Sequence, residues 1–216
     1  MTAFGMRSAS LALVSMLPAA AMAQGGSVGA VVIGVDHYLF TKPLIGVSGQ
    51  LAHQISHTPL FVRVSAQRLT RKSYRVGSTC VGLVPPNGCP SEPLRDDAGF
   101  IAGTVGVGIR LLHRRHVALN VTGDVGVSVI NLDTHGTVNG VSISARKELW
   151  DSEIGVEAAW SPWPLLPLGI NAGVAIGAER PRRNEGQIDG YSPFEETFRV
   201  MQAHIGLAWR LPARRP

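Results

Sequence analysis

The stretch FRVMQAHIGLAWRL, residues 198–211, shows an unbroken alternation of side chains. Every second residue from position 201 onward is apolar, and these residues are Met201, Ala203, Ile205, Leu207, Trp209 and Leu211. The residues between them include Gln202, His204 and Arg210. A period of two indicates an extended strand, because successive side chains point to opposite faces of a sheet. One face of this strand therefore meets an apolar environment and the other face a polar one.

Seven further segments upstream alternate in the same way, and they span residues 27–39, 44–54, 60–71, 99–112, 117–132, 141–160 and 168–179. The segment 141–160 changes phase, since Ile143 is apolar at an odd position whereas Ile154 and Trp160 are apolar at even ones. A β-bulge or a break near residues 146–152 would account for this change, because a bulge inserts one extra residue into a strand. We therefore expect eight strands, with a bulge or a break in the sixth.

The connections between these segments differ in length. Those after the second, fourth and sixth segments are short turns at residues 56–59, 113–116 and 161–167. Those after the third, fifth and seventh segments are longer and polar, and the connection after the third segment includes Asp96 and Asp97. The connection after the first segment, residues 40–43, is short. An even number of strands with short turns at one end and longer loops at the other is typical of outer-membrane barrels. Closure would also pair every backbone group within lipid. The sequence thus predicts an all-β fold, an eight-stranded antiparallel up-and-down transmembrane β-barrel.

The first residues have the features of an export signal. Arg7 precedes a short apolar run at residues 11–17, and Ala21-Met22-Ala23 stands before Gln24. Small residues at the first and third positions of such a triplet suit a signal peptidase. We expect a signal peptide over residues 1–23 and a single barrel domain over residues 24–216. No later run of about 18 apolar residues predicts a membrane-spanning helix.

Composition excludes several other classes of protein. Charged residues make up 16% of the chain, which does not fit the high charge of disordered proteins. The net charge of +5 is scattered over strand ends and loops, so no nucleic-acid partner is expected. Cys80 and Cys89 enclose a short loop, and in an oxidising compartment they would form a disulfide bond. No His or further Cys lies near them at the spacing of metal ligands, so neither a metal nor another cofactor is predicted.

Aromatic residues provide a check on dimensions. Trp150 and Trp160 are ten positions apart and share a face. In a strand tilted by about 40° this spacing corresponds to roughly 25 Å along the membrane normal, which is about the height of the apolar band of an outer-membrane barrel. Phe198 and Trp209 bracket a similar height on the last segment. These four residues are predicted to form aromatic girdles on the lipid-facing surface.

Polar residues on the opposite faces are expected to fill the barrel interior. The predicted interior network consists of Asp36, Arg63, Arg110, Asp124, Glu157 and His204. An unpaired charge in a narrow interior is costly, so the mixture of signs indicates salt bridges and hydrogen bonds. An eight-stranded barrel is only wide enough inside for its own side chains.

The closing segment resembles the C-terminal assembly signal of bacterial outer-membrane barrels, with His204, Gly206, Trp209 and Leu211 in its four positions. The layout of the whole mature chain is similar to the small eight-stranded barrels, namely the transmembrane domain of OmpA, OmpX and the opacity proteins. This resemblance implies insertion into the outer membrane by the barrel-assembly machinery. It also implies outer-membrane lipids and lipopolysaccharide as surroundings, and we expect a monomer.

Three functions fit such a barrel. The first is a non-enzymatic structural or surface-interaction role through the loops, where Arg180, Arg182 and Arg183 could meet lipopolysaccharide phosphates. The second is a lipid A-modifying acyl hydrolase or transferase, which needs a nucleophile beside a His base. The candidate pairs are Ser56 with His57 or His53, and His135 with Ser142 or Ser144. The third is a narrow channel. The first function is the prediction, with no catalytic residue assigned.

Overall fold

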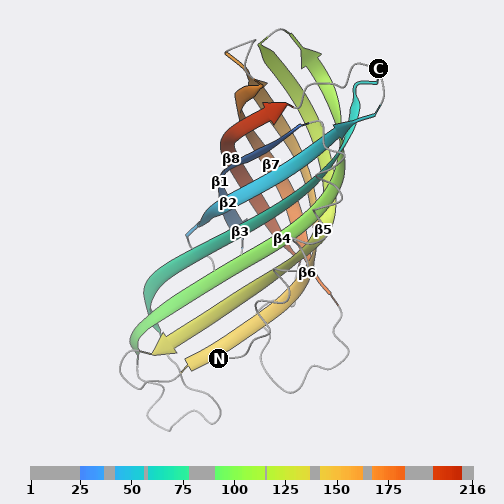
Figure 1. Cartoon of the computed structure of the whole chain (residues 1–216). Coiled ribbons are helices and arrows are strands. Elements are labelled where there is room, and N and C mark those ends of the chain that lie inside the picture. The colour runs from blue at the N-terminus through green and yellow to red at the C-terminus, as the bar shows by residue number, and fades with distance from the viewer. Residues whose placement is uncertain are drawn as a thin grey trace, which may run out of the picture.

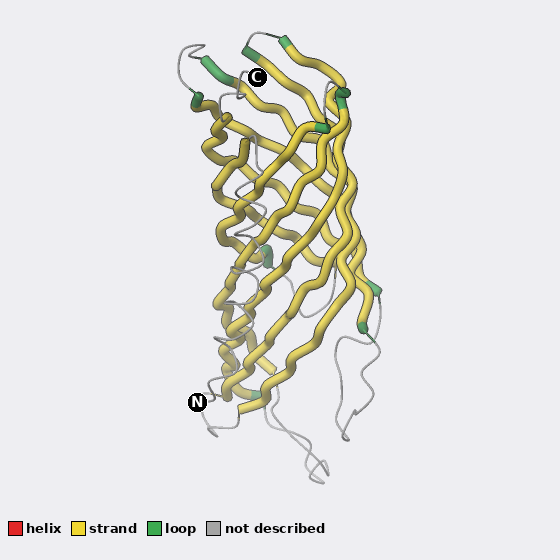
Figure 2. Tube along the Cα trace, turned by 45° about the vertical axis from the view of Figure 1, so that its right-hand side comes forward, coloured by secondary structure: helices red, strands yellow, loops and turns green. Residues whose placement is uncertain are grey.

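A computed structural model describes residues 25–36, 42–55, 58–77, 91–114, 116–136, 142–162, 167–182 and 197–210. These residues form eight strands: β1 (Gly25–Asp36), β2 (Leu44–Gln54), β3 (Leu60–Gly77), β4 (Glu92–His113), β5 (Val117–Gly136), β6 (Ser142–Trp160), β7 (Leu168–Pro181) and β8 (Phe198–Arg210). No helix among them is long and apolar enough to cross a membrane. Each strand pairs with the next in antiparallel fashion, and β8 pairs with β1 to close a barrel (Figures 1 and 2). The predicted fold class and strand order are confirmed.

The predicted alternation of faces is confirmed in six strands, the exceptions being β1 and β6. On β8, Met201, Ile205 and Leu207 are exposed on the outer face, whereas Gln202 and His204 point into the barrel. Leu207 is 68% exposed, and comparable exposure of large apolar side chains recurs around the barrel. Such a continuous apolar exterior is unfavourable in water but suited to lipid.

β1 departs from the prediction. Its interior face is apolar, because Val31, Ile33 and Val35 are buried, and Asp36 is exposed on the outer face. The placement of Asp36 in the interior network was therefore wrong. Both rows of β1 are rich in valine and isoleucine, so alternation alone did not distinguish lipid from core on this strand.

Two local predictions are corrected by the register. β5 and β6 pair without interruption from Val117–Trp160 to His135–Ser142, so the expected bulge in β6 is absent. The irregularity lies instead in β4, between Arg110 and Leu112. Strands β3 and β4 are also longer than predicted, because residues 72–77 and 92–98, including Asp96 and Asp97, belong to strands and not to a loop.

A four-stranded extension projects from the loop end of the barrel. The pairing of β2 with β3 ends at Ile45–Thr70, and that of β6 with β7 ends at Leu149–Pro181. Beyond these points, residues 71–77, 92–98, 132–136 and 142–148 of β3 to β6 continue as one sheet. In Figure 1 these four strands run past the shorter β1, β2, β7 and β8.

The interior of the barrel has two zones. Its loop half holds an apolar core, composed of Val31, Ile33, Val35, Leu44, Leu69, Ala98, Phe100, Ala102, Ile130, Leu132, Leu149, Phe198 and Val200. Its turn half is polar, with Gln50, Arg63, Asn120, Glu157 and Asn171 pointing inward.

The closing seam between β1 and β8 depends on a pair of glycines. Gly29 and Gly206 lie directly opposite each other in the register. A Cβ at Gly29 would overlap the carbonyl oxygen of Ile205 and the Cα of Gly206. Neither of these is the flexible end of a side chain, so the backbone itself would have to shift.

The substitution Gly29→Ala should therefore weaken the barrel. We expect the free energy of unfolding to fall by about 1–3 kcal/mol, the range for overpacking a well-packed site. Urea unfolding in detergent micelles measures this difference. Gly103→Ala is the matched control, because a Cβ at Gly103 on β4 has no atom within 4 Å. Equal stability of the two variants would contradict a sterically constrained seam.

Candidate functional site

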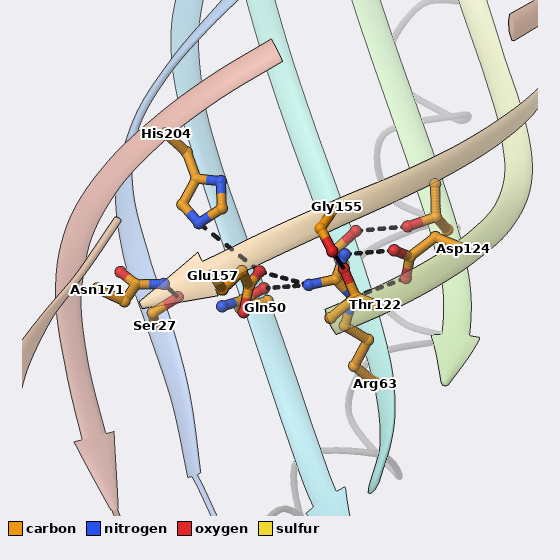
Figure 3. A network of polar contacts seen from close by, with 11 residues as sticks. Ser27, Gln50, Arg63, Thr122, Asp124, Gly155, Glu157, Asn171 and His204 are labelled. Atoms are coloured by element: carbon orange, nitrogen blue, oxygen red, sulfur yellow. Dashed lines mark hydrogen bonds and ion pairs between the residues drawn. The ribbon is translucent and has the colours of Figure 1, made fainter. Parts of the chain in front are cut away.

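Arg63 of β3 is the centre of the polar zone. Its Nε donates a hydrogen bond to Asp124 Oδ1 at 2.7 Å, and a terminal nitrogen binds the second oxygen of the same carboxylate. The other terminal nitrogen binds Glu157 Oε1 and lies 3.3 Å from Gln50 Oε1 (Figure 3). Arg63 and Glu157 are each 7% exposed and Asp124 is 4% exposed. One buried guanidinium thus links strands β2, β3, β5 and β6.

A glycine in the intervening strand makes this contact possible. Arg63 is opposite Gly106 of β4, and Gly106 is opposite Asp124 of β5. A Cβ at Gly106 would overlap the Asp124 carboxylate. The side chains of β3 and β5 therefore meet across β4 because position 106 has no side chain.

His204 completes the cluster from β8. Its Nε2 lies 3.6 Å from Glu157 Oε1. The ring fits beside Gly173 of β7, where a Cβ would lie 2.6 Å from His204 Cε1. The structure thus brings together Arg63, Asp124, Glu157 and His204 of the predicted interior network. Arg110 faces the interior closer to the turn end, where its Nη1 is 3.4 Å from Gln54 Oε1.

A second group of carboxylates lies next to this cluster. Asp151 and Glu153 of β6 and Glu179 of β7 all point inward, and Asp151 is the register partner of Glu179. Ser128 donates a hydrogen bond to Glu179 Oε2 at 2.7 Å. Both oxygens of Asp151 are buried without a hydrogen-bond partner in the described part of the chain.

Sequence reasoning missed Asp151 and Glu179 as interior residues. An uninterrupted alternation along β6 places Asp151 on the same face as Glu153. The irregularity predicted near residues 146–152 left the face of Asp151 undetermined. Within the described ranges, no cluster of three or more His, Cys, Asp or Glu residues has an arrangement that could hold a metal ion.

A cavity of about 340 Å³ lies between the ion cluster and the turn end. Small inward residues near the turn end leave room for it, namely Ala52, Ala118, Ala159 and Ala208. Its polar lining comes from Gln50, Gln54, Arg63, Arg110, Asn120, Glu157 and Asn171. Phe61, which is 6% exposed, contributes aromatic surface from β3.

The four predicted girdle residues do not share one face. Trp150 and Trp160 are on the outer face, where they are 52% and 50% exposed. Trp209 is also on that face, and its ring lies against Gly26 of β1. Phe198 is 4% exposed and belongs to the apolar core, so its assignment to the girdle was wrong. Phe198 stands at an even position, as His204 does, and these positions of β8 face the interior, whereas the odd position of Trp209 faces outward.

Some predicted sites lie outside the described residues. Cys80 and Cys89 are among them, so their disulfide bond stays a prediction. Leu211 of the assembly signal also lies outside them. Of the other residues of this signal, His204 and Gly206 are on the inner face of β8 and Trp209 is on its outer face. The assembly signal also stays a prediction.

The structure describes only some residues of the candidate catalytic pairs. His135 on β5 is the register partner of Ser142 on β6. Ser144 donates a hydrogen bond from its hydroxyl to Asp133 Oδ1 at 2.5 Å. Ser56 and His57 lie outside the described residues.

Basic and aromatic side chains meet on the outer face of β6 and β7 near the loop end. The Arg182 guanidinium lies 4.9 Å from the centre of the Trp150 ring and 3.2 Å from Glu148 Oε2. Arg180 is exposed beside them and is the register partner of Trp150. Arg183 lies outside the described residues.

No protein family and no curated protein matches this sequence, but solved structures match its fold. The chain is similar to Ail, the attachment invasion locus protein of Yersinia pestis, with 15% identity and a TM-score of 0.53 over 88% of this chain and 100% of Ail. It is similar to Neisserial surface protein A, with 9% identity and a TM-score of 0.55 over 87% and 96%. It is also similar to a major outer membrane protein from Thermus thermophilus, with 13% identity and a TM-score of 0.52 over 87% and 99%. The chain thus has the fold of small outer-membrane barrels.

Two charge substitutions should change stability in opposite directions. Arg63→Met leaves Asp124 and Glu157 buried without their cation and should lower the free energy of unfolding by about 3–5 kcal/mol. Asp151→Asn removes a buried charge that has no donor and should raise it by about 1 kcal/mol or more. Urea unfolding in micelles at neutral pH measures both.

Arg95→Met is the matched control, because Arg95 pairs with Asp97 at 3.0 Å on the exposed outer face of β4. Its effect should stay below about 1 kcal/mol. A loss for Asp151→Asn comparable with that for Arg63→Met would show that Asp151 has a stabilising partner.

Proposed function

We propose that this protein resides in the outer membrane and has a non-enzymatic role in surface interactions through its loop end. The exposed apolar exterior supports a lipid environment, and the barrel fold supports the outer membrane among the possible membranes. Residues 1–23 serve as the cleaved signal peptide in this proposal. Insertion then proceeds through the barrel-assembly machinery, with the closing strand as its signal, and the product is a monomer.

The orientation follows from the connections. In outer-membrane barrels the short turns face the periplasm and the long loops face outward. Here the β2–β3, β4–β5 and β6–β7 turns are at one end, and the extension of β3 to β6 is at the other. The extension then stands above the outer leaflet.

The extension is the observation that carries the proposed function. Its outer face is polar, with Lys72, Arg95, Asp97, Asp133 and Ser144 in neighbouring positions of the register. Tyr74 and Val76 are 71% and 76% exposed at the end of β3. A mixed polar and aromatic face, with edges of β3 and β6 beyond the pairing of β2 and β7, suits the binding of another macromolecule. The similarity to Ail, an attachment protein by its name, is consistent with this role.

Contact with lipopolysaccharide is the second part of the proposal. Arg180 and Arg182 lie on the outer face at the loop-end edge of the apolar surface, next to Trp150. Tryptophan favours the boundary between lipid and water, and arginine binds phosphate with two parallel hydrogen bonds. The pair would therefore meet the phosphates of the outer leaflet.

Labelling of intact cells tests location and orientation together. In a background of Cys80→Ser and Cys89→Ser, Ser144→Cys on the extension should react with a membrane-impermeant maleimide on intact cells. Arg114→Cys, in the turn between β4 and β5, should react only after the outer membrane is permeabilised. The reverse pattern, or equal reaction of both before permeabilisation, would overturn the proposed orientation.

Titration of the purified barrel with lipopolysaccharide tests the arginine contact. The double variant Arg180→Gln, Arg182→Gln should bind at least about tenfold more weakly, which corresponds to about 1.4 kcal/mol. Arg114→Gln at the opposite end should bind like the unmodified protein. Dephosphorylated lipopolysaccharide should abolish the difference between the double variant and the unmodified protein. Unchanged affinity of the double variant would contradict the contact.

A further inference from the structure

The outer face of the extension continues the lipid-facing surface of the barrel. On β5 one outward row runs from Val125 and Val127, which are 61% and 44% exposed, to Asp133. Val127 is the register partner of Trp150, and Asp133 lies six residues beyond Val127 toward the loop end. In a strand tilted by about 40°, this spacing is roughly 15 Å along the membrane normal. The head group of a lipid packed against the apolar row would therefore lie beside Asp133.

Polar side chains on this face are held in place by one another. Arg95 Nη2 lies 3.0 Å from Asp97 Oδ2, and Arg95 Nε donates a hydrogen bond to Asp97 Oδ1 at 3.3 Å. On the next two strands, Ser144 donates to Asp133 Oδ1 at 2.5 Å. Asp97 and Asp133 are register partners, so the two pairs are adjacent. Side chains that are already fixed lose little conformational entropy when they bind a ligand.

Two residues of β3 complete this surface. Lys72 is exposed and is the register partner of Asp97, and Tyr74 is 71% exposed and is the register partner of Arg95. We call this surface the extension patch, and it consists of Lys72, Tyr74, Arg95, Asp97, Asp133 and Ser144. It combines balanced charges, fixed hydrogen-bonding groups and one exposed aromatic ring.

These properties favour a sugar over other ligands. The centres of protein–protein interfaces are depleted of Lys and Asp, and a polyanion would meet the two adjacent carboxylates of the patch. Sugar hydroxyl groups both donate and accept hydrogen bonds, so they can pair with cations and carboxylates alike. The C–H face of a sugar ring can also pack on the aromatic ring of Tyr74. The extension patch therefore suits an oligosaccharide.

We propose that the extension patch binds the core oligosaccharide of lipopolysaccharide molecules that pack against the barrel. Their acyl chains contact the apolar row, their phosphates meet the arginines beside Trp150, and their core sugars contact Tyr74 and Asp133. The lipid supplies the sugar because the patch lies on the same outer face as the apolar row and faces sideways into the leaflet. This inference rests on the proposed orientation, and it extends the proposed phosphate contact to the sugars.

Titration of the refolded full barrel in detergent with two lipids tests the proposal. One is lipopolysaccharide with a complete core oligosaccharide, and the other is lipid A, which has the phosphates but lacks the core sugars. We expect the complete-core lipid to bind at least about tenfold more tightly than lipid A. Equal affinity for the two lipids would overturn the proposal.

Variants of the extension patch locate the sugar contact. The double variant Tyr74→Ala, Asp133→Ala should bring the two affinities to within about twofold of each other by weakening only the binding of the complete-core lipid. Asp36→Ala is the matched control, because it removes an exposed carboxylate at the loop end of β1, outside the extension, and it should leave both affinities unchanged. Heat-modifiable gel mobility shows that each variant is folded.

The phosphate contact is separated from the sugar contact by the double variant Arg180→Gln, Arg182→Gln, which should weaken the binding of both lipids by the same factor. A preference for the complete-core lipid that persists in Tyr74→Ala, Asp133→Ala would place the sugar elsewhere and overturn the proposal. That result leaves the proposed location and orientation intact, because labelling of Ser144→Cys and Arg114→Cys on intact cells tests those independently. Reversed labelling would contradict the orientation and, with it, any contact between the patch and lipopolysaccharide in cells.

Discussion

Closure of the sheet is the constraint on which the rest of this structure depends. Backbone groups of a strand within lipid need partners from other strands, and an open edge leaves a row of them unpaired. β1 meets β8 over its full length, from Gly25–Arg210 to Asp36–Arg199, and this pairing satisfies the last edge. The Gly29–Gly206 pair on this seam shows how little room the closed backbone leaves. The apolar exterior and the crowded interior both follow from closure.

Closure also forces charged side chains into a narrow interior, where each must find a partner. The Arg63 cluster meets this demand by linking four strands through one guanidinium, and Gly106 and Gly173 provide the space. In the group of Asp151, Glu153 and Glu179, several carboxylate oxygens have no hydrogen-bond partner in the described residues. The loop side combines an apolar core with buried polar side chains such as Arg71, Asp96 and Glu179.

The two ends of the barrel present different kinds of residue. The extension of β3 to β6 presents a polar outer face at the loop end, and Trp150 with Arg182 lies at the edge of the apolar surface. The cavity at the turn end is separated from that surface by the apolar core and the Arg63 cluster.

The sequence by itself determined the number of strands, their order and the direction of nearly every side chain. Alternation on β5, β7 and β8 is a local property, since successive residues of a strand must face opposite sides. It failed on β1, where both rows are apolar and Asp36 was placed inside. It also failed for Phe198, whose aromatic character suggested lipid although its parity matched the interior residues. Only the tertiary structure decided that Arg63 reaches Asp124 across Gly106, that the bulge lies at Arg110 and that β3 to β6 extend beyond their neighbours. These features depend on the register between strands distant in sequence, and no local pattern encodes that register.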